Sequence, residues 1–91
     1  MNFHFVYFAQ SQGDFSVYVG YTINLKERMA QHNAGKTKST KSKTPLTLIY
    51  FEAYTSKSDA LKREKFIKNN YACKMEIISR FSDFKGFSPK G

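Results

Sequence analysis

Arg28 and His32 are four residues apart in a segment with a helical pattern, so their side chains project in one direction, a turn apart. At ~100° per residue, Leu25 and Met29 mark the inward stripe of this helix, and the two polar residues fall beside it. An arginine fork suits phosphate oxygens, and histidine exchanges protons near neutral pH. The pair indicates either a phosphate site, or a solvent-reaching arginine beside a hydrogen-bonded boundary histidine.

Glu64 lies in the middle of the apolar stripe of a second predicted helix. On the helical wheel it is surrounded by Ala60, Leu61, Ile67 and Lys68, whereas Lys62 and Lys65 point outward. Burying an unpaired carboxylate costs several kcal/mol, so Glu64 is expected to have a partner. That partner is either a metal ion or a cationic side chain such as Arg28.

Tyr7 and Tyr18 stand in two predicted neighbouring strands, residues 3–9 and 15–21. Tyrosine is common in strands because its ring packs well on a half-buried pleated surface. Residue type alone therefore assigns each of them to the core.

The chain is strongly basic, with a net charge of +8 and a pI near 9.7 over 91 residues. Such a balance points to a polyanionic partner: nucleic acid, an anionic membrane surface or an acidic protein. Residues 36–43 are predicted to form an exposed loop in which lysines alternate with small hydroxyl residues, a pattern that suits phosphate tracking more than base reading. The alternative is a merely solvated loop. Its lysines are Lys36, Lys38, Lys41 and Lys43.

Cys73 is the single cysteine, which excludes a disulfide scaffold and a thiolate zinc site. A reducing, cytoplasmic setting is therefore expected. No stretch approaches the ~20 apolar residues of a membrane span, and residues 1–9 lack the basic leader of a secretory signal.

The elements that must position these residues follow from periodicity and caps. A hairpin of strands at 3–9 and 15–21 precedes a helix at 25–33, capped by Asn24 and ended by Gly35. A third strand at 46–54 precedes helices at 57–70 and 72–80, the first of them capped by Ser56. The order ββαβαα predicts one α+β domain, residues 1–80, with a three-stranded antiparallel sheet flanked by helices. Residues 81–91 are expected to form a tail, with Phe81, Phe84 and Phe87 available for packing.

Short motifs in the same segments resemble the GIY-YIG nuclease family over residues 3–70. The first strand has Tyr7 but lacks the family's initial glycine, and the second has Val19 in place of isoleucine. The order and spacing of the motifs are specific, although each one is short. The matching residues are Val6-Tyr7, Tyr18-Val19-Gly20-Tyr21-Thr22, Asn24-Leu25, Arg28, Gln31-His32-Asn33, Gly35, Thr44-Pro45-Leu46, Leu48-Ile49-Tyr50, Ala60-Leu61-Lys62-Arg63-Glu64 and Ile67-Lys68.

This resemblance implies an endonuclease that hydrolyses phosphodiester bonds, with structure-directed DNA cleavage in repair or recombination as the expected role. It implies Tyr7 as general base, Tyr18 as the group that positions water or phosphate, and His32 as proton acceptor or phosphate ligand. Arg28 would stabilise phosphate charge, and Glu64 would bind one Mg²⁺ or Mn²⁺ ion.

Two other functions remain open. One is a non-catalytic module that binds nucleic acid, and the other is a protein-interaction module that uses the aromatic tail. DNA is expected as the partner ahead of RNA, with a protein partner for targeting. The chain itself is expected to be a monomer.

Overall fold

The computed structural model describes residues 2–81, so residues 82–91 of the expected tail, with Phe84 and Phe87, lie outside the described residues. The expected packing of Phe81 is confirmed, because its ring lies against the core, 5.7 Å from that of Tyr50. The elements run in the order β1 (His4–Ser11), β2 (Val17–Thr22), α1 (Leu25–Asn33), the 3₁₀ turn η1 (Lys41–Lys43), β3 (Leu46–Tyr54), α2 (Lys57–Lys68) and α3 (Tyr71–Ile78). The predicted order ββαβαα and the α+β class are confirmed.

The three strands form one antiparallel sheet in the order β2-β1-β3, so β1 is central and β2 is an edge strand. The hairpin turn was misplaced by prediction, since Ser11 still pairs with Leu46 of β3 and β2 begins only at Val17. Phe15 explains the later start, because its φ of 62° is left-handed and incompatible with a strand. The turn is closed by the Ser11 hydroxyl, which accepts hydrogen bonds from two turn amides.

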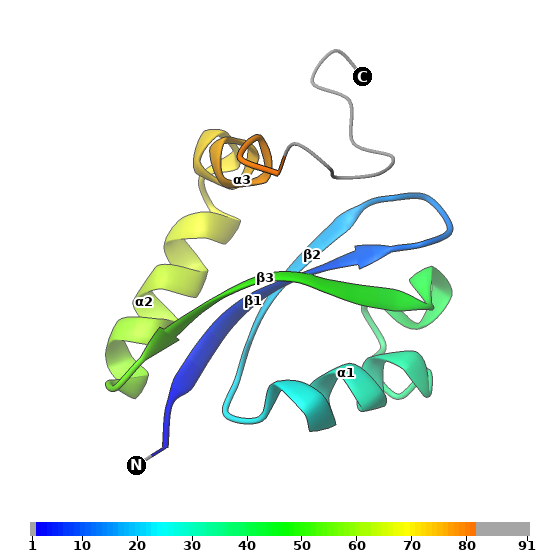
Figure 1. Ribbon diagram of the computed structural model, residues 1–91, viewed down its shortest axis with the longest axis horizontal. Coiled ribbons are helices and arrows are strands. Elements are labelled where there is room, and N and C mark those ends of the chain that lie inside the picture. Colours follow the sequence, from blue (N-terminus) through cyan, green and yellow to red (C-terminus); the bar gives the residue numbers. More distant parts are fainter. Residues whose placement is uncertain (1, 82–91) are drawn as a thin grey trace.

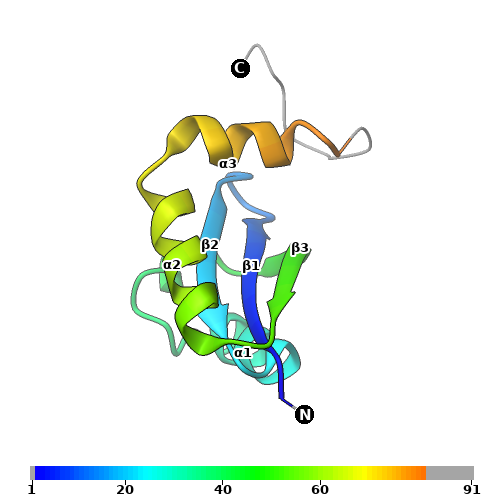
Figure 2. The same cartoon turned by 90° about the vertical axis from the view of Figure 1, so that its left-hand side faces the viewer.

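Helices cover both faces of the sheet, with α1 on one side and α2 with α3 on the other (Figures 1 and 2). Alternation along β1 sends Val6 and Phe8 to the α2 and α3 side, where they pack against Ile67. The same alternation sends Tyr7 and Ala9 to the α1 side, where the second cluster forms. Within residues 2–81, no helix has the length and apolar character needed to span a lipid bilayer.

The predicted helix caps are confirmed. The side chain of Asn24 accepts a hydrogen bond from the amide of Glu27 at 3.0 Å, and that of Ser56 accepts one from Asp59 at 3.2 Å. Gly35 has the left-handed φ, +73°, expected after α1.

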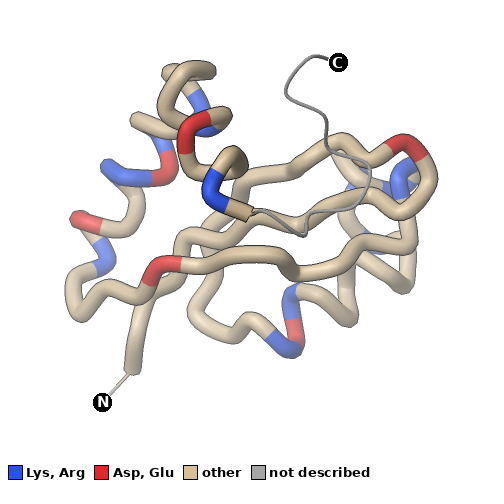
Figure 3. The backbone as a smooth tube through the Cα atoms, turned by 45° about the horizontal axis from the view of Figure 1, so that its top comes forward, with Lys and Arg blue, Asp and Glu red and all other residues tan. Residues whose placement is uncertain are grey.

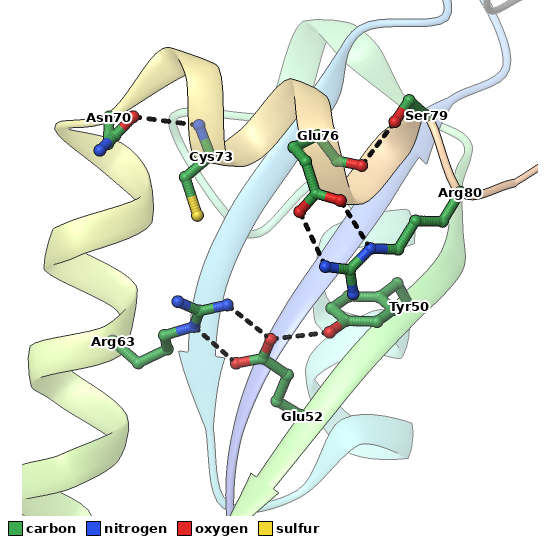
Figure 4. A network of polar contacts seen from close by, with 8 residues as sticks. All are labelled: Tyr50, Glu52, Arg63, Asn70, Cys73, Glu76, Ser79 and Arg80. Atoms are coloured by element: carbon green, nitrogen blue, oxygen red, sulfur yellow. Dashed lines mark hydrogen bonds and ion pairs between the residues drawn. The ribbon is translucent and has the colours of Figure 1, made fainter.

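A polar network, absent from the sequence-based predictions, attaches α2 to β3 (Figure 4). Arg63 of α2 donates two hydrogen bonds to the carboxylate of Glu52, at 2.9 and 3.1 Å. Hydroxyls of Tyr50 and Tyr54 also donate to this carboxylate, each at 2.7 Å. Burial alone would raise the pKa of Glu52, but these hydrogen bonds outweigh it and lower the pKa. The network therefore holds α2, the helix that carries Glu64, at a defined position against the sheet.

Candidate active site

Tyr7 of the central strand lies across Gly20 of the edge strand, its partner in the sheet register. A Cβ atom at residue 20 would lie 2.5 Å from the Tyr7 hydroxyl oxygen and 2.6 Å from ring carbon Cζ. Only glycine leaves room for this approach, so Gly20 sets the position of the tyrosine hydroxyl.

A buried chain of hydrogen bonds starts at this hydroxyl. Tyr7 Oη lies 2.7 Å from His32 Nε2, and His32 Nδ1 lies 2.7 Å from Thr40 Oγ1. All three side chains are fully buried. Arg28 Nε donates to Tyr7 Oη at 3.3 Å. Because Arg28 can only donate, the network is satisfied when Tyr7 donates to Nε2 and Nδ1–H donates to Thr40, a tautomer assigned from the network.

Burial keeps both Tyr7 and His32 neutral at pH 7. It raises the pKa of Tyr7 to about 12, although the hydrogen bond from Arg28 acts in the opposite direction. Burial also lowers the pKa of His32, and the positive charge of Arg28 lowers it further. The resting state thus pairs a protonated phenol with an imidazole nitrogen that is free to accept its proton.

His32 has no exposed surface, and both of its ring nitrogens have hydrogen-bond partners. Of the two roles expected for it, this geometry favours proton acceptance from Tyr7 over direct phosphate binding. The alternative of a hydrogen-bonded boundary histidine is right about the hydrogen bonds but wrong about the position, because His32 is fully buried and Thr40 from the segment after α1 binds it.

Arg28 is half-buried and faces the same hydroxyl from α1. Its Nη1 donates to Gln31 Oε1 at 3.1 Å, and its hydrogen bond to Tyr7 raises its pKa, with a smaller contribution from Tyr18. The guanidinium has five N–H donors, so these contacts leave others for an anion. Arg28 therefore lies in the same cluster as Tyr7 and His32 and does not simply extend into solvent.

Tyr18 sits between the two halves of the site. Its ring centroid is 6.2 Å from that of Tyr7 and 5.2 Å from that of His32. On its other side, Lys68 Nζ lies 5.6 Å from the Tyr18 centroid, within the range of a cation–π contact. Tyr18 thus links the cluster under α1 with the side chains of α2.

Glu64 approaches the same strand edge from α2. Its side chain is 18% exposed, and its carboxylate pairs with Lys68 Nζ at 3.0 Å. Burial is the main cause of the raised pKa of Tyr7, and the negative charge of Glu64 adds a smaller contribution, which places the two groups in electrostatic reach. The suggested ion pair with Arg28 is wrong, since the cationic partner is Lys68. The predicted apolar stripe is also narrower than expected, because Leu61 is exposed.

Glu64 offers a single carboxylate to a metal ion. Residues 2–81 contain no cluster of three or more His, Cys, Asp or Glu side chains that could enclose one. A lone, partly exposed carboxylate fits Mg²⁺ or Mn²⁺, which keep several waters and are commonly completed by substrate phosphates. The same donor set would not fit a structural zinc ion.

The basic segment after α1 is more structured than the predicted exposed loop. Lys36, Lys38 and Lys41 are exposed, whereas Lys43 pairs with Asp14 at 2.7 Å. Thr40, the residue that binds His32, carried no signal in the sequence, because it stands among lysines and small hydroxyl residues. Figure 3 shows that Lys and Arg positions occur on both α1 and α2, on opposite sides of the sheet.

Comparison with known proteins gives a consistent picture. The sequence profile of the GIY-YIG catalytic domain matches residues 3–76. A UPF0213 protein of Staphylococcus haemolyticus is 48% identical over 66 residues, covering 71% of this chain and 79% of the relative. One of Natronomonas pharaonis is 42% identical over 76 residues, covering 82% and 88%. The solution NMR structure of a UPF0213 protein from Bacillus halodurans superimposes with a TM-score of 0.57 at 29% identity, covering 92% of this chain and 90% of the other.

Proposed function

The chain belongs to the GIY-YIG catalytic domain family, and we propose that it is a divalent-metal-dependent endonuclease that cuts DNA at branched or single-stranded sites. The observation that carries this proposal is the buried chain from Tyr7 through His32 to Thr40, with Arg28 placed on the same hydroxyl. A neutral, buried histidine that can accept a proton from a phenol beside a cation is the arrangement that a proton relay needs. Repair or recombination is the setting that we propose for such cleavage.

In the proposed reaction, Arg28 binds the scissile phosphate and stabilises the charge that develops on its oxygens. Water loses a proton to Tyr7 Oη while the phenol proton passes to His32 Nε2, which leaves an imidazolium that donates to Thr40. The oxygen of this water bonds to phosphorus as the P–O bond to the leaving strand breaks, and the leaving oxygen takes a proton from solvent. Tyr18 orients the phosphate or the water. When bound, a divalent ion held by Glu64 would supply charge neutralisation at the phosphate and the leaving oxygen.

The resting structure keeps Tyr7 out of solvent. The tyrosine is fully buried, and Arg28 donates to its hydroxyl. We infer that phosphate competes for the guanidinium and draws it away, so that water reaches Tyr7 only once substrate is bound. Access of water to the general base, Tyr7, would thereby depend on bound substrate, without the need for a separate lid.

The remaining expectations stay proposals. We propose a monomeric, cytoplasmic protein whose catalytic unit spans residues 1–80 and whose tail, residues 81–91, is available to a targeting partner. The exposed lysines of the 36–43 segment would track the DNA backbone through charge alone, giving binding that weakens steeply with salt.

A nicking assay tests the proposal. The protein is incubated with labelled single-stranded, duplex, flap and four-way-junction DNA in Mg²⁺, in Mn²⁺ and in EDTA. Metal-dependent nicking of the branched or single-stranded substrates is expected, and EDTA is expected to abolish it. Firm, salt-sensitive binding without cleavage in any metal would instead establish a binding module.

Cleavage is expected to depend on pH through His32. Because its pKa lies below 6.5, the imidazole is neutral and able to accept a proton above that pH, and activity should fall as pH drops through this lowered pKa. Folding stability is expected to change with pH in the same direction. A histidine whose pKa is lowered in the folded state stabilises the fold above pH 6.5, and this contribution is lost as the pH falls through the lowered pKa. Tyr7 keeps its proton well past pH 9, so a plateau is expected from pH 7 to 9.

Single-turnover rates between pH 5 and 9 measure this dependence, with the fraction folded checked at each pH. The His4→Gln variant is the control, because it removes the other histidine, which binds Tyr21 away from the site. The control should keep the wild-type profile. A cleavage rate that falls as the pH rises from 6 to 8 would contradict the proposed proton relay.

A further inference from the structure

A hollow of about 280 Å³ runs along the outer edge of β2, next to the candidate active site. Val17, Val19 and Ile67 give it an apolar floor between β2 and α2. Tyr18, Lys68 and Tyr71 also line it. Because Tyr18 also lies against Tyr7 and Lys68 pairs with Glu64, a ligand in the hollow would lie next to the candidate active site.

Tyr71 is the unexplained feature of this hollow. It is 73% exposed, the highest value among the exposed large apolar side chains of the described chain. Its backbone is ordered as the first residue of α3, whose N-cap Asn70 accepts a hydrogen bond from the Cys73 amide at 3.0 Å. An aromatic side chain that starts a helix and is left in solvent contributes little to the core, but it offers a flat face to a ligand.

The charges of the hollow select an anionic ligand. Lys68 is exposed and lies between Glu64 and the ring of Tyr18. Lys74 donates to the Val17 carbonyl at 2.7 Å, so it satisfies the edge strand and closes one end of the hollow. An aromatic face over an apolar floor with lysine beside it is the arrangement on which proteins stack the bases of single-stranded nucleic acid.

We propose that this hollow holds one unpaired nucleobase adjacent to the scissile phosphate, stacked on Tyr71, with its phosphate beside Lys68. The inference deepens the proposed nuclease function and rests on it for the position of the scissile bond. A base inside a duplex is not available to the hollow, because unstacking and unpairing it costs a few kcal/mol. The subsite would therefore direct cleavage to single strands, flaps and frayed junctions.

Binding in EDTA tests the subsite without cleavage. Short DNA oligonucleotides with one 2-aminopurine are titrated with wild type, Tyr71→Ala and Tyr71→Phe, alongside a duplex of the same sequence. Tyr71→Ala is expected to weaken single-strand binding ~5- to 150-fold, as the loss of one stacked base does, and to abolish the fluorescence quench of 2-aminopurine. Tyr71→Phe should retain both properties, and duplex affinity should change less than twofold.

Phe66→Ala is the matched control, since Phe66 is an α2 aromatic that is 50% exposed and does not line this hollow. If Tyr71→Ala behaves like Phe66→Ala, or weakens single-strand and duplex binding equally, the subsite is wrong. Circular dichroism checks that both variants fold. The two proposals can fail separately. Base stacking on Tyr71 without any nicking would support the subsite and contradict the nuclease function. Nicking that does not change in the Tyr71→Ala variant would support the nuclease function and contradict the subsite.

Discussion

Replacing Glu64 by glutamine is expected to slow metal-dependent DNA cleavage by about 1,000-fold, because a bound divalent ion supplies several kcal/mol of charge stabilisation and each 1.36 kcal/mol is tenfold in rate. Glutamine keeps the shape of the side chain but removes the charge that would bind the ion. The fold should survive, since the carboxylate loses only its i,i+4 pair with Lys68. Single-turnover nicking in Mg²⁺ and in Mn²⁺ measures the effect.

Glu76→Gln is the matched control for this variant. Glu76 also forms an i,i+4 pair, with Arg80 at 2.7 Å, but it lies exposed on α3. The control should cleave at the wild-type rate, and Glu64→Gln should still bind DNA in EDTA. If the cleavage rate of Glu64→Gln falls by less than tenfold, Glu64 is not a metal ligand, and its role is only to pair with Lys68.

The Tyr7→Phe variant is expected to lose ~100- to 10,000-fold in single-turnover rate, the usual contribution of a general base. It also leaves Nε2 of the fully buried His32 without its partner, so about 1–3 kcal/mol of stability should be lost. A lower melting temperature together with a near-complete loss of cleavage would show that the hydroxyl contributes both to folding stability and to the reaction. Assays are therefore run well below the melting temperature of the variant.

Tyr21→Phe separates these two effects. The Tyr21 hydroxyl also binds a histidine, at 2.8 Å from Nδ1 of His4, but that histidine is only half-buried. This control loses one hydrogen bond of the same type and should retain cleavage. If Tyr7→Phe cleaves as fast as Tyr21→Phe, the base must be another group, and the Tyr7 hydroxyl serves only to hold His32.

Most of the fold could be predicted from local signals in the sequence. Caps at Asn24 and Ser56 and the left-handed Gly35 depend on neighbouring residues alone, so the helix starts and the end of α1 were predictable. The β1–β2 turn was not, because the left-handed φ of Phe15 opposes the strand preference of an aromatic residue. Tertiary pairing of Ser11 with β3 overrides that local preference.

Residues of the candidate site could be predicted only where the residue type itself indicates a chemical role. The structure brings Tyr7, Tyr18, Arg28 and His32 together, and it brings Glu64 to the same strand edge. Thr40 was missed because its role exists only after the segment following α1 folds back over His32. The partner of Glu64 was misassigned for a related reason. A helical wheel shows which residues share a face, but it does not show that Lys68 reaches back over the same edge.

The contact between Gly20 and Tyr7 offers a way to sort related chains. Every codon change that replaces this glycine adds a Cβ atom, and that atom would overlap the tyrosine ring. Strand β2 would still pair with β1, so such a chain could keep its fold and its overall resemblance while its tyrosine is displaced from the histidine. In a survey of genomes, residue 20 would therefore separate chains able to retain the proposed proton relay from those that have kept only the scaffold.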